Sequence, residues 1–145
     1  MSEQWRDITE LNGDYQVSSL GRIRRATPCK GKGCKLTEVG KIVKGEFSSR
    51  GYMRLRMKHR GFSKYIHRIV AECFLPNPHN LPFIHHINHI KTDNRLSNLM
   101  WCSVDENNQY NILLTVDALL HMLDPNKSYT KQDLLDMVGT YRVGS

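Results

Sequence analysis

The sequence predicts an α+β fold: a module of small antiparallel sheets, then a strand–loop–strand–helix unit, then a short helical tail. Period-two alternation of apolar and polar residues runs through the first half of the chain, as in strands with one buried face. A short apolar run that carries His85 and His86, and a second at Leu99–Cys102, enclose a polar turn ahead of a helix start at Ser103 or Asp105. Amphipathic patterning of helical period marks the tail.

The composition bounds the size and class of the protein. The chain has 145 residues, of which 39% are hydrophobic, and this is enough for one compact domain with a small appendage. No apolar run approaches the roughly 18 residues that span a bilayer, so we expect no transmembrane helix. The polar start MSEQWRDITE lacks the apolar core of a secretory signal, so we expect a cytoplasmic protein.

Positive charge is concentrated in the first half of the chain. The net charge is +7, and the isoelectric point is near 9.4. Residues 1–70 hold 16 Lys or Arg against 6 Asp or Glu, whereas residues 71–145 hold 5 against 8. A basic surface of this kind favours an anionic partner such as nucleic-acid phosphates. The alternative is an ordinary solvated basic surface.

The four cysteines are expected to be reduced thiols, because no secretory signal precedes them. Cys29 and Cys34 lie in PCKGKGCK, close enough for one half of a zinc knuckle. Cys73 and Cys102 are isolated in apolar runs, so the second half of a four-cysteine site is missing. Two core cysteines and two loop cysteines are therefore favoured, and a zinc ion at the first pair stays open.

Residues 5–25 predict a small sheet. Turns are indicated at Asn12-Gly13 and at residues 19–21, with short strands at 15–18 and 22–25. The large apolar side chains of this segment are expected in the core: Trp5, Tyr15 and Val17. The basic side chains alternate with Ile23 and are the ones free to contact DNA: Arg22, Arg24 and Arg25.

Residues 26–40 are rich in Lys and Gly without a period and predict a loop. Residues 41–47 and 51–66 predict three more strands, with a hairpin turn at residues 59–61. Between residues 52 and 58, apolar side chains alternate with a comb of basic ones: Arg54, Arg56 and Lys58. A β-ribbon of this kind can enter a DNA groove. The alternative is a solvent-facing sheet surface.

Two further helical regions follow from periodicity. Residues 67–74 predict a short helix that ends before Pro76, with His67 as a structural support. The tail predicts amphipathic helices at 116–123 and 131–138, with Thr115 and Thr130 as N-caps. The second is loosely similar to the first helix of a helix-turn-helix, but only residues 140–145 remain for a recognition helix. We therefore expect two packing helices.

Residues 83–108 carry His, Asn and Trp at a distinctive spacing. Asn98 follows His86 by 12 residues and Asn107 follows it by 21, and an Asn-Leu-x-Trp segment ends at Trp101. This constellation resembles the HNH nuclease motif of the homing endonucleases of phages and introns. At residues 88–90 that family has Asp-Gly-Asn, whereas this chain has Asn-His-Ile. Without glycine, the turn cannot rely on free access to positive φ.

The first part of the chain resembles the NUMOD4-like module that precedes the HNH motif in homing endonucleases. The matching positions are Trp5, Ile8, Tyr15, Val17, Ser18, Gly21, Arg22 and Ile23. Together, the two resemblances imply a β-rich basic DNA-binding module at 1–66, a ββα-metal nuclease motif at 67–112 and a helical tail at 113–145.

The resemblance implies a site-specific DNA endonuclease, phage-encoded, which acts on double-stranded DNA in a bacterial host cell. His86 corresponds to the general base, and Asn98 to the residue that braces the base and the loop. His85 and Asn107 correspond to the ligands of one divalent ion, expected to be Mg²⁺. A neutral His–Asn pair holds this hard ion weakly, so Mn²⁺, Ni²⁺ and Zn²⁺ stay open. Strand alternation sends His85 and His86 to opposite faces, so we expect a distorted strand end.

Other interpretations stay open. A DNA-binding module with a degenerate nuclease site would explain the departure at residues 88–90. A restriction-type nuclease that cuts both strands as a dimer would carry the same motif, so the protein is expected to be a monomer or a homodimer. A plain surface loop rich in His and Asn would put Asn98, Trp101 and Asn107 in register only by accident.

Overall fold

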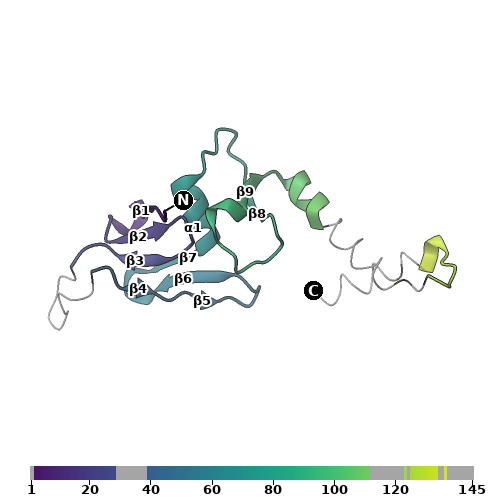
Figure 1. Cartoon of the computed structure of the whole chain (residues 1–145), viewed down its shortest axis with the longest axis horizontal. Coiled ribbons are helices and arrows are strands. Elements are labelled where there is room, and N and C mark those ends of the chain that lie inside the picture. The colour runs from purple at the N-terminus through teal and green to yellow at the C-terminus, as the bar shows by residue number, and fades with distance from the viewer. Residues whose placement is uncertain (1, 29–38, 112–122, 124, 134–135, 137–145) are drawn as a thin grey trace. The chain divides into compact units, whose positions relative to one another are not determined.

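The computed structural model describes residues 2–28, 39–111, 123, 125–133 and 136 (Figure 1). The chain divides into two compact units, Met1–Cys102 and Ser103–Ser145. Cys29, Cys34, most of the expected loop at 26–40 and nearly all of the expected helix at 116–123 lie outside the described residues. In the described part of the chain, no helix has the length and apolar character that crossing a membrane requires.

The first sheet is antiparallel, in the order β1-β2-β3-β4 (Figure 1). Its strands are β1 (Trp5–Asp7), β2 (Tyr15–Ser18), β3 (Ile23–Arg25) and β4 (Ile42–Val43), and the short 3-10 helix η1 (Thr9–Leu11) joins the first two. The strands predicted from residues 15–25 are confirmed. The inward side chains of β2 and β3 are buried, because the alternation of period two places Tyr15, Val17 and Ile23 on one face.

The second sheet contains β5 (Glu46–Phe47), β6 (Met53–Met57) and β7 (Phe62–Tyr65), also antiparallel. The expectation of a single strand over residues 41–47 is wrong, since Lys44-Gly45 separates β4 from β5 and the two join different sheets. A Cβ atom at Gly45 would lie 2.8 Å from Ile66 Cδ1 and 3.2 Å from Arg54 O, so little space is left there for a side chain. Lys58, expected on the strand, instead opens the turn η3 (Lys58–Arg60).

Helix α1 (Ile66–Phe74) follows β7 directly, and the third sheet follows α1. That sheet is an antiparallel pair, β8 (Phe83–His86) and β9 (Leu99–Cys102), with the 3-10 turn η4 (Leu96–Asn98) just before β9. The strand–loop–strand arrangement predicted from the apolar runs is confirmed.

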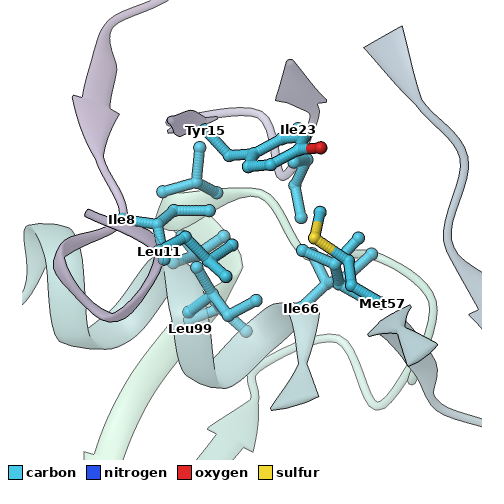
Figure 2. Close-up of a cluster of buried hydrophobic side chains, with 11 residues drawn as sticks. Ile8, Leu11, Tyr15, Ile23, Met57, Ile66 and Leu99 are labelled. Atoms are coloured by element: carbon cyan, nitrogen blue, oxygen red, sulfur yellow. The ribbon is translucent and has the colours of Figure 1, made fainter. Parts of the chain in front are cut away.

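One hydrophobic core joins the three sheets within the first unit (Figure 2). Side chains of α1 lie at its centre, including Ile66, Ile69 and Val70. They pack against apolar residues of the first two sheets and against Leu99 of β9. Burying apolar area of this kind is the main favourable term in folding, so the strand pair β8–β9 depends on the N-terminal sheets for its stability.

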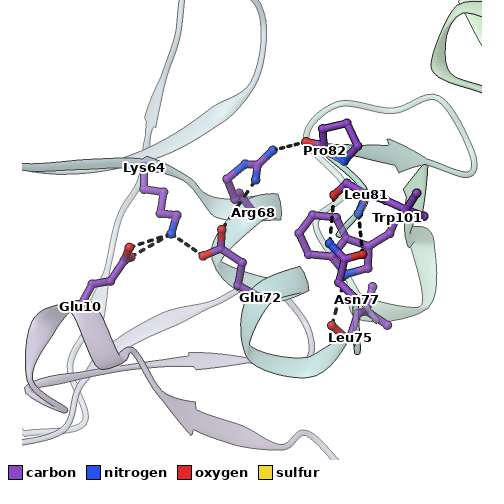
Figure 3. A network of polar contacts seen from close by, with 9 residues as sticks. All are labelled: Glu10, Lys64, Arg68, Glu72, Leu75, Asn77, Leu81, Pro82 and Trp101. Atoms are coloured by element: carbon purple, nitrogen blue, oxygen red, sulfur yellow. Dashed lines mark hydrogen bonds and ion pairs between the residues drawn. The ribbon is translucent and has the colours of Figure 1, made fainter. Parts of the chain in front are cut away.

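Polar contacts fix the connection between α1 and β8 (Figure 3). Asn77 donates to Leu81 O (2.9 Å) and accepts from Leu81 N (2.8 Å), which closes this connection on itself. Trp101 of β9 donates its indole N–H to Leu75 O (3.2 Å), and Arg68 of α1 donates to Pro82 O (2.7 Å). The tryptophan of the Asn-Leu-x-Trp segment therefore ties β9 to the end of α1.

A neighbouring ion-pair network ties α1 to the N-terminal sheets (Figure 3). The ammonium of Lys64 on β7 lies 2.9 Å from the Glu10 carboxylate and also pairs with Glu72 of α1. Arg68 reaches Glu72 across one helical turn at 3.7 Å. These pairs are partly exposed, so they orient the elements more than they stabilise them.

The second unit begins with a capped helix. Residues 104–111 are helical, and Ser103 and Glu106 form a reciprocal capping box, with N–H bonds of 2.8 and 3.2 Å. Thr130 and Asp133 form a second box, with bonds of 2.8 and 3.1 Å, and residues 131–133 are helical. The predicted N-cap at Thr130 is confirmed, and the N-cap predicted at Thr115 lies outside the described residues.

Candidate active site

The loop between β8 and β9 is braced by Asn98. Its amide oxygen accepts from Asn88 N (2.9 Å), and its amide nitrogen donates to Asn88 Oδ1 (2.8 Å) and to Asp93 O (2.9 Å). The side chain is buried, so each of these bonds satisfies a group that water cannot reach. Asn98 therefore holds the loop, as expected, but none of these three hydrogen bonds involves His86.

Asn94 is the residue that holds His86. Asn94 is buried, and its amide oxygen lies 3.1 Å from His86 Nε2. An amide oxygen only accepts, so the contact is a hydrogen bond in the tautomer in which Nε2 carries the proton and Nδ1 is the basic nitrogen. This role is not apparent from the sequence, in which Asn94 is one of several polar residues of the loop.

His86 lies in a cluster of aromatic and imidazole rings from four parts of the first unit, defined here as the ring cluster: Tyr52, Tyr65, His67 and His86. The His86 ring centroid is 5.0 Å from that of His67 and 5.9 Å from that of Tyr52. His67 stacks on Tyr65 at 5.4 Å and contacts Tyr52 at 5.1 Å. Tyr52, which directly precedes β6, is half-buried against these rings.

Burial sets the protonation state of the two histidines in the ring cluster. It lowers the pKa of His86 below its ordinary value, while the hydrogen bond with Asn94 opposes the change. Burial lowers the pKa of His67 to about 3, and the charges of His86 and Arg68 add to this effect. Both rings are therefore neutral near pH 7, and a neutral His86 can accept a proton.

The N-terminal sheet contacts the loop that holds His86. Leu96 N donates to Ser19 O (2.8 Å), which joins the turn after β2 to the loop before β9. At Gly21, which has φ +78°, a Cβ atom would lie 2.9 Å from both Cβ and the carbonyl oxygen of Asn94. Glycine is needed there for both its conformation and its size, and this contact sets the position of Asn94.

His85 lies apart from the ring cluster. Its ring centroid is 5.0 Å from that of His89, at an interplanar angle of 65°. The strand β8 pairs regularly through His86, opposite Leu99, so the distorted strand end expected there is absent. The irregularity comes three residues later, where His89 has φ +62°.

The arginines predicted to contact DNA already have partners in the protein. Arg22 pairs with Glu3, and Arg24 donates to Gln16 Oε1 (2.8 and 2.9 Å) above the ring of Trp5. Arg25 donates to Tyr15 Oη (2.9 Å) and Thr27 O (2.9 Å). On β6, Arg54 lies 2.8 Å and Arg56 3.9 Å from Glu46 Oε1, while Lys58 is exposed. The ion pairs with Glu3 and Glu46 are partly exposed and contribute little to stability, whereas the hydrogen bonds of Arg24 and Arg25 are part-buried.

The donors available for a metal ion near His86 are neutral. Among the described residues, no group of three or more His, Cys, Asp and Glu side chains is placed to hold a metal ion. The loop carboxylate, Asp93, is held by Arg95 at 2.7 and 2.8 Å and by Asn88 at 2.8 Å. Asn107 belongs to the helical segment of the second unit, so its role as a ligand stays a prediction from the sequence.

Family models match two consecutive parts of the sequence. The NUMOD4 motif matches residues 3–58, and the HNH endonuclease model matches residues 64–109. The chain carries a NUMOD4 motif followed by an HNH endonuclease domain. The matched residues include those that carry the resemblance described under Sequence analysis. The resemblance to homing endonucleases with these two motifs is therefore confirmed.

Relatives of this HNH protein include two curated proteins of Acanthamoeba polyphaga mimivirus. The uncharacterized HNH endonuclease L245 is 29% identical over 68% of this chain, and the uncharacterized HNH endonuclease L247 is 31% identical over 75% of it. The chain spans about a quarter of the length of each, 27% and 26%.

A solved structure with the same fold is described as "DNA binding and cleavage by the HNH homing endonuclease I-HmuI". It is 28% identical to this chain, with a TM-score of 0.58, and the match covers 75% of this chain and 57% of that one. The predicted fold class is confirmed by this similarity.

The contact between Gly21 and Asn94 yields a first prediction. Gly21→Ala should destabilise the protein by more than Gly40→Ala, because both glycines have positive φ but a Cβ atom at Gly40 meets nothing within 4 Å. The φ penalty of about 1 kcal/mol is common to both variants, so the difference between their urea midpoints isolates the contact with Asn94. Equal midpoints would mean that Gly21 does not set the position of Asn94.

The buried neutral His67 yields a pH prediction. Its pKa is about 3 in the fold and 6.5 when unperturbed, so the unfolded chain binds the extra proton between these values. Stability from neutral His67 is fully present above pH 6.5 and is lost as the pH falls toward 3. Urea denaturation of His67→Phe should show a shallower loss with falling pH, by up to about 1.4 kcal/mol per pH unit. Parallel curves for parent and variant would contradict this.

Proposed function

We propose that this chain is a site-specific, homing-type DNA endonuclease that hydrolyses phosphodiester bonds with one divalent ion and a histidine general base. The observation that carries the proposal is the hydrogen bond between His86 Nε2 and Asn94 Oδ1 at 3.1 Å. It fixes the tautomer in which Nδ1 can take a proton, inside a chain whose HNH domain matches a family of endonucleases. The DNA substrate is supported by the described DNA binding and cleavage of I-HmuI.

His86 would act by taking a proton from the attacking water. A general base works best when it is neutral at the working pH and held in place. Burial keeps His86 neutral, and Asn94 fixes its ring plane. The rings of His67 and Tyr52 limit its movement from the other side. Asn98 supports this arrangement by bracing the loop that carries Asn94.

His85 and Asn107 are the proposed ligands of the divalent ion. A bound divalent ion supplies charge stabilisation for the phosphate and the leaving oxygen during hydrolysis. An imidazole and an amide fit such an ion chemically, but they add no negative charge for Mg²⁺, the ion expected from the family. They suit ions that accept nitrogen ligands better.

The proposed DNA-binding surface comprises basic side chains in the first two sheets and in the turns beside them: Arg22, Arg24, Arg25, Arg54, Arg56 and Lys58. Double-stranded DNA is the proposed partner, because the excess positive charge lies in this half of the chain. Gel filtration with and without DNA would distinguish a monomer from a homodimer. A phage origin and a cytoplasmic location in the host cell are part of the same proposal.

A second candidate function is DNA binding without cleavage. The observation in its favour is the replacement of the family's Asp-Gly-Asn by Asn88, His89 and Ile90 next to the proposed base. Incubation of supercoiled plasmid with the protein and Mg²⁺, Mn²⁺ or Co²⁺ separates the two functions. Nicked or linear product that disappears in EDTA supports the nuclease, whereas retention of supercoiled DNA with every ion supports the binding module.

Replacement of the base yields the next prediction. His86→Ala should lower the single-turnover cleavage rate by about 10²–10⁴-fold, because no other group takes the proton. DNA affinity should change little, since the proposed phosphate contacts lie elsewhere. The matched control is His79→Ala, which removes an exposed histidine from the connection before β8. Cleavage by folded His86→Ala at the parent rate would rule out the assignment.

The basic comb on β6 yields a prediction about binding. Replacement of Arg54, Arg56 and Lys58 by Ala should weaken DNA binding and lower the slope of log affinity against log salt by roughly three units, about 0.9 per phosphate contact. If an arginine contacts a base edge instead, its loss should relax specificity at one base pair by about 1–3 kcal/mol. Cleavage at saturating protein should persist.

Two controls sharpen this measurement. Glu46→Gln should strengthen binding, because the carboxylate competes with phosphate for Arg54 and Arg56. Replacement of Lys127 and Lys131 by Ala lowers the net charge outside the comb and should leave the salt slope nearly unchanged. If the comb variant keeps the parent slope, β6 faces solvent and the contacts belong to Arg22, Arg24 and Arg25.

A further inference from the structure

His89 occupies a backbone conformation that favours glycine. Its φ is +62°, and its N–H donates to His86 O (2.9 Å), which closes a tight turn directly after β8. Histidine tolerates this region better than most side chains, yet it still bears a conformational cost that glycine would not. The two other non-glycine residues with positive φ in the described part of the chain are both asparagines, Asn12 and Asn80. A residue other than glycine or asparagine at such a strained position points to a function for its side chain.

The strained residue faces a histidine of the proposed nuclease site. The ring centroids of His85 and His89 are 5.0 Å apart, and the planes are inclined by 65°. With metal–nitrogen bonds of about 2.0–2.1 Å and a ring centre about 1.2 Å behind the nitrogen, two imidazoles on one tetrahedral ion have centroids about 5 Å apart. The observed separation is compatible with a shared ion, and it equals the edge-to-face separation of His67 and His86.

The chemistry of the pair selects among ions. Two imidazoles offer neutral nitrogen donors, which bind Co²⁺, Ni²⁺ and Zn²⁺ well and Mg²⁺ poorly. The carboxylate of Asp93 in the same loop is already paired with Arg95 and Asn88. With Asn107 as the third proposed ligand, the ion still has positions open for water and a DNA phosphate, as a catalytic site needs.

We propose that His85 and His89 together hold the divalent ion of the nuclease site and make it selective for nitrogen-accepting ions, Co²⁺, Ni²⁺ or Zn²⁺, over Mg²⁺. This inference rests on the proposed function for its catalytic meaning. Its binding part stands on the geometry of the pair, so it can be tested without cleavage.

The test measures Co²⁺ binding to the full chain in the absence of DNA, by calorimetry and by the visible absorption of the bound ion. All proteins carry Cys29→Ser and Cys34→Ser, so that a thiolate site cannot contribute. His85→Ala and His89→Gly should each weaken Co²⁺ binding by about 10-fold or more, at least the effect of losing an outer partner of a ligand. His79→Ala should bind like the parent, and none of these proteins should show comparable binding of Mg²⁺.

The stability of His89→Gly separates a lost ligand from a damaged fold. Glycine relieves the positive φ, so the thermal midpoint without metal should be equal to or above that of the parent. His89→Asn, which keeps a tolerated φ but removes the imidazole, should lose Co²⁺ binding in the same way. If His89→Gly or His89→Asn binds Co²⁺ as tightly as the parent, the inference is overturned.

Cleavage is then measured separately, with Co²⁺ and with Mg²⁺. A parent that cleaves faster with Co²⁺, and a His89→Gly variant that loses this preference, support the inference. A parent that cleaves equally well with both ions and is unaffected by His89→Gly overturns it and leaves the proposed nuclease intact. Tight Co²⁺ binding at His85 and His89 without cleavage by any ion would overturn the proposed function and retain the metal site.

Discussion

The burial of one face of α1 is the interaction on which the rest of the first unit depends. Ile66, Ile69 and Val70 pack between the N-terminal sheets and Leu99 of β9. A two-stranded ribbon such as β8–β9 is marginal by itself in water, because it has no second layer to cover its apolar face. The helix supplies that layer, and the same helix carries His67 into contact with His86. Stability and the placement of the candidate base therefore have one physical origin.

Within the first unit, the candidate site is held by buried polar groups that hydrogen-bond to one another. Asn98 makes three hydrogen bonds that shape the loop, and Asn94 makes the bond that orients His86. A buried polar group without partners would cost about 1–3 kcal/mol, so the loop has few alternative arrangements. His67 Nδ1 departs from this pattern, as it is buried without a hydrogen-bond partner among the described residues. The surrounding rings hold this histidine by packing instead.

The sequence carried the local features of the fold and the identity of the motif. The sequence predicted β2, β3 and β6 from the alternation of apolar and polar residues, and β8 and β9 from their apolar runs. Both signals depend only on neighbouring residues. The break at Lys44-Gly45 was not predicted, since it depends on which sheet each strand joins. Asn94 and Tyr52 were missed for the same reason, as their partners appear only when the loop and β6 meet His86. The contact of Asn98 with the loop could be inferred because the spacing of the motif singles out this residue.

The contact of the turn at Ser19 and Gly21 with the loop at Asn94 bears on how such genes can recombine. An exchange of segments between residues 58 and 64 would leave both family motifs complete, yet it would pair a turn and a loop with different histories. Van der Waals contact at Gly21 and the bond from Leu96 N to Ser19 O tolerate little mismatch. In a chimera of two such proteins, His86 should be held in position only when the turn at residues 19–21 and the loop at residues 94–96 come from the same parent. The two motifs are therefore expected to evolve as one hereditary unit, although their sequences can be recognised separately.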